Sequence, residues 1–255
     1  MTQALRHPAI LDLARRDGKV TVDGLAAHFG VTLQTIRRDL TDLAESGRLE
    51  RVHGGAVLPS GTTNIDYQER RNLQRSSKAE IADICATLIP NGSCLFLGIG
   101  TTCEAIAGAL TQHENLLVIT NNMNVANLLS GHRQAEIIVT GGTLRKTDGG
   151  LVGNVATRII EQFKFDVAFI GCSALDDDGD VLDFDIQEVA VSQTILKQSR
   201  QVYLASDQSK FLRKAPIRVA NLKDLTGFIS DAPPPSDLSS ACISWGTDIY
   251  LTDCS

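Results

Sequence analysis

The spacing of hydrophobic residues divides this chain into two parts near residue 80. In the first part, Leu33, Ile36, Leu40 and Leu43 recur at steps of three, four and three. This spacing predicts a helix with one apolar stripe. The polar positions that fall off the stripe are Gln34, Thr35, Arg37 and Arg38. We therefore expect a helix that packs by one side and presents polar side chains on the other.

The residues around this stripe predict two further helices and a hairpin. Apolar positions favour helices over 4–16 and 23–29, each closed by a glycine, with Asp23 as the N-cap of the second. Thr32 is the expected N-cap of the third helix, over 33–46. Residues 19–22 have a short β-like pattern, and 49–55 read as a two-stranded β-wing. Helix, short turn and polar-faced helix together are typical of a helix-turn-helix.

Amide, hydroxyl and guanidinium groups on the third helix can donate hydrogen bonds to base edges and phosphates in the DNA major groove. An ordinary amphipathic surface helix is the alternative, and either arginine could instead pair with Asp39, Asp42 or Glu45 on the same helix. The wing would add contacts to the sugar-phosphate backbone. The candidate DNA-binding residues are Thr32, Gln34, Thr35, Arg37, Arg38, Arg51 and His53.

Beyond residue 80, short apolar runs alternate with helical patterns. The runs are 93–97, 116–120, 135–140, 165–171 and 201–207, and the helical patterns include 78–88, 103–110 and 123–129. Repeated β-α units predict an open, mostly parallel sheet with helices on both sides. We therefore expect an α/β chain with a winged helix-turn-helix over 1–58, a linker over 59–79 and a sensor domain over 80–255.

Small polar residues follow four of the expected strands, where ligands bind in parallel sheets. A glycine-rich turn that opens a helix presents backbone N–H groups to an anion, and Lys210 would add a counter-charge. A set of tight turns is the simpler alternative. The candidate residues for a phosphate-bearing effector are Gly100, Thr101, Thr102, Asn121, Asn122, Gly141, Gly142, Asp207 and Lys210.

Composition narrows the class of protein. The chain is 43% hydrophobic and 21% charged with a net charge of -6, which is typical of a globular protein. Residues 1–58 hold eight basic and seven acidic residues, so DNA binding would depend on how the basic groups are placed. The six cysteines include no C-x-x-C pair, and no apolar run approaches a membrane span. We expect a cytoplasmic protein with no metal site, no cofactor and no membrane association.

Two motifs carry a family resemblance. The run T-I-R-R-D-L at 35–40, followed by H-G-G-A at 53–56, resembles the head of the DeoR family of bacterial transcriptional repressors. The body is similar to the sensor domain of that family, which is itself similar to ribose-5-phosphate isomerase. The matching segments are 89–93, 99–102, 120–127, 148–150 with 153, 184–185 with 188–189, 209–211 and 231–235.

This resemblance implies a repressor that a phosphorylated sugar or polyol releases from operator DNA. It favours glycerol 3-phosphate and adds Asp148, Gly149 and Glu188 to the candidate effector site. A different sugar phosphate is the alternative, because Gly98 stands where the family usually has aspartate and 190–193 lack its usual basic residues. Two-fold operators need two heads, so we expect a homo-oligomer.

Catalysis is the competing function. The acidic residues at 176–178, 180, 183, 185 and 188 could support sugar-phosphate isomerisation or hold a divalent cation. A solvated acidic hairpin is the simpler interpretation of this segment. The lysine-glycine stretch that resembles an isomerase active site is absent downstream. We therefore predict a sensor that binds its ligand without turning it over, with no catalytic residues.

Overall fold

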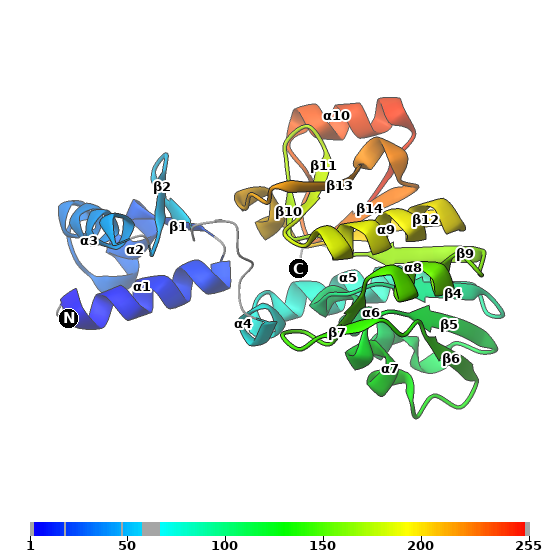
Figure 1. Cartoon of the computed structure of the whole chain (residues 1–255). Coiled ribbons are helices and arrows are strands. Elements are labelled where there is room, and N and C mark those ends of the chain that lie inside the picture. Colours follow the sequence, from blue (N-terminus) through cyan, green and yellow to red (C-terminus); the bar gives the residue numbers. More distant parts are fainter. Residues whose placement is uncertain (1–2, 18, 47, 58–66, 253–255) are drawn as a thin grey trace.

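The computed structural model describes residues 3–17, 19–46, 48–57 and 67–252 (Figure 1). The N-terminal part up to residue 57, which we call the head, contains three helices: α1 (Gln3–Asp17), α2 (Val22–Phe29) and α3 (Leu33–Glu45). Three short antiparallel strands in the order β1-β3-β2 complete it: β1 (Lys19–Thr21), β2 (Glu50–Val52) and β3 (Gly55–Val57). The predicted wing is thus a three-stranded sheet, because β1 pairs with β3.

Two local expectations for the head were wrong. Thr21, not Asp23, caps α2, because its side chain accepts a hydrogen bond from the N–H of Gly24 and the helix starts at Val22. Leu33 was expected on the buried stripe but is 41% exposed, because it lies in the first turn of α3. Ile36, Leu40 and Leu43 of the same stripe are buried as predicted.

A seven-stranded parallel sheet forms the centre of the body, in the order β15-β14-β12-β9-β4-β5-β6. Its strands are β4 (Cys94–Leu97), β5 (Leu116–Thr120), β6 (Ala135–Val139), β9 (Phe165–Ile170), β12 (Ser199–Ala205), β14 (Gly227–Ser230) and β15 (Asp248–Leu251). The five predicted strands are present. The strands β14 and β15, which the sequence did not indicate, extend the sheet at one edge.

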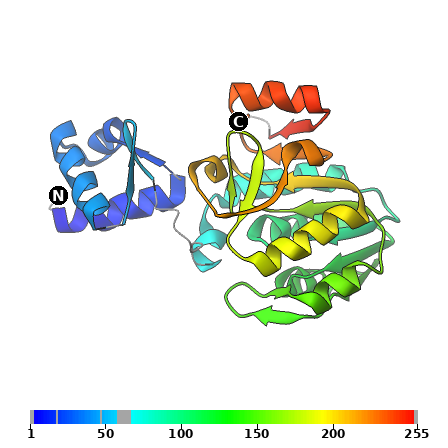
Figure 2. The ribbon, with the colours of Figure 1, turned by 45° about the horizontal axis from the view of Figure 1, so that its top comes forward.

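Helices cover both faces of this sheet. One layer contains α5 (Arg75–Thr87), α6 (Thr101–Ala109) and α7 (Met123–Leu129), and the other contains α8 (Asn154–Ile160), α9 (Ile186–Gln198) and α10 (Ser236–Trp245). Alternate residues of β4 divide between the two cores, since Phe96 belongs to one cluster while Leu95 and Leu97 belong to the other. Figure 2 shows α9 along one face of the strands, with α5 on the opposite side.

Smaller elements surround the carboxyl ends of the strands. They are α4 (Tyr67–Asn72), the hairpin β7 (Thr143–Arg145) and β8 (Gly150–Val152), and a second sheet of β10 (Ala174–Leu175), β11 (Asp180–Asp183) and β13 (Ile217–Asn221). The 3-10 turns are η1 (Leu110–Gln112), η2 (Gln208–Leu212) and η3 (Leu222–Asp224).

The predicted linker over 59–79 divides into two parts. Residues 58–66 lie outside the described residues, whereas α4 and the start of α5 are helical and contact the body. Lys78, at the boundary we expected, is buried and donates to the backbone oxygen of Leu73. We therefore propose that the sensor domain begins near Tyr67 and not at residue 80.

The order of the strands places a topological switch between β4 and β9. From β4 the chain adds β5 and β6 on one side, then returns to β9 on the other side of β4. Loops leave β4 and β9 in opposite directions at this point, which is where ligands bind in open α/β sheets. The segments that follow these two strands are 98–102 and 171–173.

Candidate DNA-binding surface and effector site

The third helix of the head buries one side and exposes the other, as predicted. Thr32 caps it by accepting a hydrogen bond from the N–H of Thr35 at 3.2 Å. Gln34, Arg37 and Arg38 are exposed, and Thr35 is half-buried. A short helix with this exposed set of amide and guanidinium groups has the composition that base edges and phosphates require.

Asp39 has a partner on a different helix. Its carboxylate is buried and receives two hydrogen bonds from Arg6 of α1, with Nε to Oδ2 at 2.7 Å and Nη2 to Oδ1 at 3.1 Å. Within the described part of the head, neither Arg37 nor Arg38 forms an ion pair. The ion pair therefore fixes α3 against α1 and leaves both candidate DNA-binding arginines available.

The wing is attached to the same helix. Arg51 of β2 is exposed, and its Nη1 donates to the backbone oxygen of Arg37 at 3.2 Å. His53 is exposed at the turn between β2 and β3. A Cβ at Gly55 would lie 1.9 Å from the carbonyl oxygen of Val20, so only glycine permits β1 to approach β3 here. The hydrogen bond to Arg37 thus places Arg51 beside α3.

In the body, a small cavity opens at the topological switch point. Its volume is about 30 Å³. The lining comes from Arg70 of α4, segments 99–102 and 171–173, Asp183 of β11, Glu188 of α9 and Lys210 of η2. The predicted residues Gly100, Thr101, Thr102, Glu188 and Lys210 therefore meet in one place. Gly100 precedes α6, and the first two residues of that helix, Thr101 and Thr102, belong to this lining.

Basic side chains gather at one end of the site. Lys210, Lys78 and Arg213 act electrostatically on Asp207, and the charge of Arg70 acts on Lys210. Burial lowers the pKa of Lys210 to about 8, and the charge of Arg213 adds to this effect while Asp207 opposes it. Burial opposes ionisation of Asp207, yet Lys210 and Ser209 hold its pKa below the ordinary value. Three cations thus act on one carboxylate, which leaves this end positive and suited to an anion.

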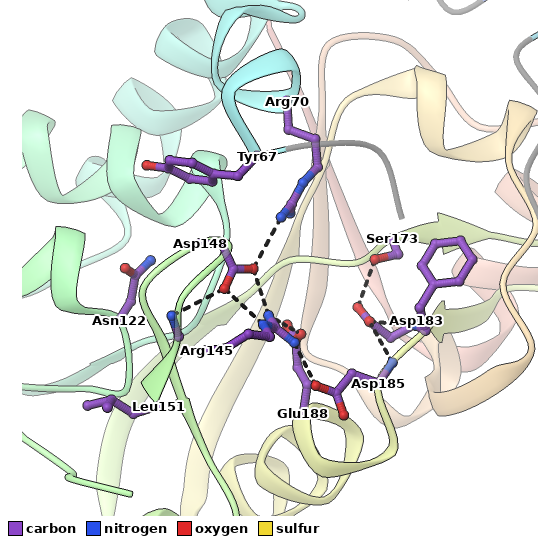
Figure 3. A network of polar contacts seen from close by, with 12 residues as sticks. Tyr67, Arg70, Asn122, Arg145, Asp148, Leu151, Ser173, Asp183, Asp185 and Glu188 are labelled. Atoms are coloured by element: carbon purple, nitrogen blue, oxygen red, sulfur yellow. Dashed lines mark hydrogen bonds and ion pairs between the residues drawn. The ribbon is translucent and has the colours of Figure 1, made fainter. Parts of the chain in front are cut away.

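Acidic side chains gather around Arg145 on β7. Its guanidinium contacts Asp148 at 2.7 Å, Asp185 at 2.8 Å and Glu188 at 2.6 Å (Figure 3). Burial raises the pKa of Glu188 to about 7, with the charge of Asp183 adding to the rise and Arg145 opposing it. Arg145 therefore ties the β7-β8 hairpin to the start of α9 beside the cavity.

Helix α4 covers the same region, and the sequence did not indicate that it takes part in the site. Arg70 Nη2 lies 3.1 Å from Asp148 Oδ2 (Figure 3). The Tyr67 hydroxyl donates to Glu104 Oε2 at 2.9 Å. Asn124 Nδ2 donates to the Tyr67 hydroxyl at 3.0 Å. Mixed charge over 66–73 resembles a solvated linker, so only the aromatic residue beside two arginines could have signalled a packed helix.

The remaining predicted residues shape the site without lining its cavity. Asn121 Nδ2 donates to the carbonyl of Leu151, and Asn122 caps α7 through the N–H of Asn124. Asp148 is neutralised by two arginines, and Asp207 caps η2 through Ser209. Glycines with positive φ angles make the turns on either side of β7, and these are Gly141, Gly142 and Gly149.

The acidic segment after β10 is a hairpin turn. Asp176, Asp177 and Asp178 are exposed between the antiparallel strands β10 and β11. No cluster of three or more potential metal ligands occurs among the residues described. Nor does any helix in those ranges have the length and apolar content to cross a membrane. The described cysteines are free thiols, with Cys85, Cys103 and Cys242 buried.

Comparison with known proteins decides the family. The model of the DeoR-like helix-turn-helix domain matches residues 6–62, and that of the DeoR C terminal sensor domain matches residues 73–232. The chain belongs to the DeoR family. It is thus a DeoR-type DNA-binding repressor with a sensor domain, and not an isomerase.

Several curated DeoR-family relatives are similar over nearly the whole chain. The glycerol-3-phosphate regulon repressor of Escherichia coli K12 is 44% identical over 92% of this chain and 93% of its own length. The repressor of the same name from Haemophilus influenzae is 44% identical over 91% of each chain. The transcriptional repressor CsqR of Escherichia coli K12 is 35% identical over 92% of this chain and 90% of its own.

Among solved structures, ribose 5-phosphate isomerase A of Methanocaldococcus jannaschii aligns with a TM-score of 0.40 and 13% identity. The alignment covers 55% of this chain and 56% of the isomerase, so the chain spans about half of that enzyme's length. A probable sor operon regulator of Shigella flexneri aligns with a TM-score of 0.39 over 54% of this chain and 76% of its own.

Proposed function

We propose that this repressor binds glycerol 3-phosphate in the cavity at the switch point and then releases operator DNA. The observation that carries the proposal is the convergence of Arg70, Lys210 and the N-terminus of α6 on one cavity. Charged donors and free backbone N–H groups together form the environment that a phosphate group requires. The relatives named for glycerol 3-phosphate, at 44% identity, favour this effector over other phosphorylated polyols.

The size of the cavity supports a link between binding and movement. With a volume of about 30 Å³, the cavity is small for a phosphorylated polyol. We therefore expect binding to move side chains of its lining. Arg70 belongs to α4, which follows residues 58–66 and hence the head in the chain. A ligand that moves Arg70 would act directly on the segment that leads to the DNA-binding surface.

The effector assignment is tested by calorimetric titration of the full chain without DNA. Glycerol 3-phosphate should bind and should raise the melting temperature as its concentration passes the dissociation constant. Lys210→Ala should weaken binding at least tenfold, because a charged hydrogen bond contributes about 1.5–3 kcal/mol. Lys164→Ala, at an exposed lysine that donates to the carbonyl of Lys197, is the matched control. Equal affinity in wild type and Lys210→Ala would place the phosphate elsewhere.

Thr101 offers a second, smaller test of the same site. Its hydroxyl lies at the start of α6 in the cavity lining and contacts the carbonyl of Arg70 at 3.5 Å. Thr101→Val keeps the shape of the side chain and removes the donor. Operator binding should remain while induction by glycerol 3-phosphate weakens. Unaltered induction in both Thr101→Val and Lys210→Ala would refute the proposed location.

A second part of the proposal concerns assembly. One helix such as α3 reads only a few base pairs, so specific binding to a two-fold operator needs two heads. We therefore propose that the repressor acts as a homo-oligomer, at least a dimer. Sedimentation of the full chain at micromolar concentration should give twice the 27.4 kDa chain mass or a larger multiple. A monomer that binds its operator with full affinity would contradict this part.

A further inference from the structure

Asp183 is a buried carboxylate that pairs with no cation in the part of the chain that the structure describes. It is 7% exposed and lines the effector cavity. Its Oδ1 accepts hydrogen bonds from the N–H groups of Phe184 at 2.6 Å and Asp185 at 3.4 Å, and its Oδ2 accepts one from Ser173 Oγ at 3.0 Å. No ion pair to Asp183 occurs among the described residues.

The neighbouring carboxylates, in contrast to Asp183, are paired with arginines. Asp148 is equally buried, but Arg145 and Arg70 both pair with it. Glu188 and Asp185 each contact Arg145. Burial of a carboxylate that has no cationic partner costs folding free energy. We therefore expect Asp183 to have a role in ligand binding. An ionised carboxylate has about four acceptor positions, so Oδ2 of Asp183 can accept one more hydrogen bond.

Lys210 and Glu188 both line the cavity but have different ionisable neighbours, and the ion pair between Arg70 and Asp148 connects the two sets. The ionisable neighbours that act most strongly on Lys210 are Arg213, Asp207, Cys172 and Arg70. Those that act most strongly on Glu188 are Asp183, Arg145 and Asp148. The two sets share no member. Figure 3 shows Arg70 above Asp148, Glu188 below it and Asp183 to its right.

We propose that Asp183, with Glu188 beside it, accepts hydrogen bonds from hydroxyl groups of the effector and excludes ligands that carry a second anion. This inference rests on the proposed function, because it assumes that the phosphate occupies the basic end. A neutral polyol chain can donate to both carboxylates. A carboxylate or second phosphate at the same place meets like charge within a buried site, which is strongly unfavourable.

Glycerol 3-phosphate and 3-phosphoglycerate differ only at the carbon that the proposal places beside Asp183 and Glu188. Glycerol 3-phosphate ends in CH2OH, and 3-phosphoglycerate ends in a carboxylate at the same carbon. Propyl phosphate keeps the phosphate and lacks both hydroxyls. The test is calorimetric titration of the full chain with these three compounds at pH 8, for the wild type, Asp183→Asn and Glu188→Gln. Two variants are used because Asp183 also holds the backbone of Phe184.

The wild type should prefer glycerol 3-phosphate to each of the other two compounds by about 10- to 100-fold, as expected for hydrogen bonds to charged groups. Asp183→Asn and Glu188→Gln should each reduce the preference over 3-phosphoglycerate at least tenfold, because an amide can donate to a carboxylate. Asp185→Asn is the matched control. It removes a carboxylate that also contacts Arg145 but does not line the cavity, and asparagine can still cap α9.

The proposal is overturned if the wild type binds 3-phosphoglycerate within threefold of glycerol 3-phosphate. It is also overturned if both variants keep the wild-type preference, or if Asp185→Asn reduces that preference as strongly as they do. In all three cases the proposed function stands, because a phosphorylated ligand still binds. If none of the three compounds binds to the wild type, the proposed function fails and this inference fails with it.

Discussion

Arg70 Nη2 and Asp148 Oδ2 lie 3.1 Å apart, and this ion pair joins α4 to the β7-β8 hairpin beside the effector cavity (Figure 3). Arg70 therefore belongs both to the cavity lining and to the first described helix after the head. Its Nε is buried and has no hydrogen-bond partner within the described chain. A bound phosphate would satisfy that donor and compete with Asp148 for the guanidinium.

Arg70→Ala should weaken binding of glycerol 3-phosphate at least tenfold, because it removes a charged donor from the cavity. It should also reduce the change in operator affinity that a saturating effector produces. Arg71→Ala is the control, since Arg71 is exposed on the same helix. Calorimetry gives the first quantity and fluorescence anisotropy with promoter DNA the second. Equal effects of both substitutions would show that the loss is a general consequence of changing α4.

Tyr67→Phe separates binding from transmission. The substitution keeps the ring and removes the hydroxyl that joins α4 to Glu104 of α6 and to Asn124 of α7. We expect the effector affinity to stay within about threefold, because Tyr67 does not line the cavity. The coupling between effector and operator, which is typically about 1–3 kcal/mol, should fall. A variant with unchanged coupling would remove α4 from the transmission pathway.

The pH dependence of effector binding follows from Lys210. Burial lowers its pKa to about 8, and its neighbours Arg213, Asp207, Cys172 and Arg70 modify this. A phosphate dianion favours the protonated lysine, so affinity should fall about tenfold between pH 7.5 and 9.5. Binding at pH 8.5 should take up protons, which calorimetry in buffers of different ionisation enthalpy detects. Glu188, whose pKa burial raises to about 7, titrates mainly below this range.

The same lowered pKa has a consequence for stability without effector. The unfolded chain keeps Lys210 protonated up to its ordinary pKa of 10.5, whereas the folded chain loses that proton near pH 8. Between these values the unfolded state binds more protons, so the contribution of Lys210 to folding stability rises with pH. The destabilising charge is fully present below pH 8. In Lys210→Met, this rise in stability between pH 8 and 10 should be smaller than in the wild type.

In the head, the ion pair between Arg6 and Asp39 should decide the stability of the DNA-binding unit. Asp39→Ala leaves the Arg6 guanidinium without the carboxylate that orients it between α1 and α3. We expect the melting temperature of the head to fall by several degrees, with effector binding by the body unchanged. Asp42→Ala, at a half-buried residue of the same helix, should have a much smaller effect. Similar effects of the two changes would contradict a special role for Asp39.

Hydrophobic spacing and capping residues predicted those elements whose structure depends on residues close together in the sequence. The buried stripe through Ile36 and Leu40, the Thr32 cap and the strand-turn-helix at Gly100 all follow from spacing within a few residues. The contacts that complete both sites are long-range. Arg6 is 33 residues from Asp39, and Arg70 is 78 residues from Asp148, so no local pattern indicates either pair.

Neither departure from the family pattern belongs to the cavity lining, although Gly98 directly precedes the lining residue Ile99. A Cβ at Gly98 would lie 3.3 Å from the carbonyl oxygen of Phe169, so a side chain there would require a small adjustment of β9. Ala190 and Gln193 are exposed on α9, and Gln193 Nε2 donates to the carbonyl of Val219. Since none of these positions lines the cavity, they do not weaken the proposal of glycerol 3-phosphate.

Substitutions on the polar face of α3 test whether this helix contacts DNA. Arg37→Ala and Arg38→Ala should each weaken operator binding about tenfold or more and lower the salt dependence of binding, because each removes one cation from the DNA surface. Both side chains are exposed, so the melting temperature should not change. Arg133→Ala, at an exposed residue of the body, is the control. Unchanged affinity in both head variants would remove α3 from the DNA interface.

The central claim is that a phosphorylated polyol in the cavity of the body controls DNA binding by the head. The most direct measurement is fluorescence anisotropy of labelled promoter DNA from glycerol-uptake and glycerol-phosphate genes, with the full chain bound. Added glycerol 3-phosphate should release the DNA from the wild type and not from Lys210→Ala. DNA that stays bound to the wild type at saturating glycerol 3-phosphate, or that is released equally from both proteins, would contradict the account.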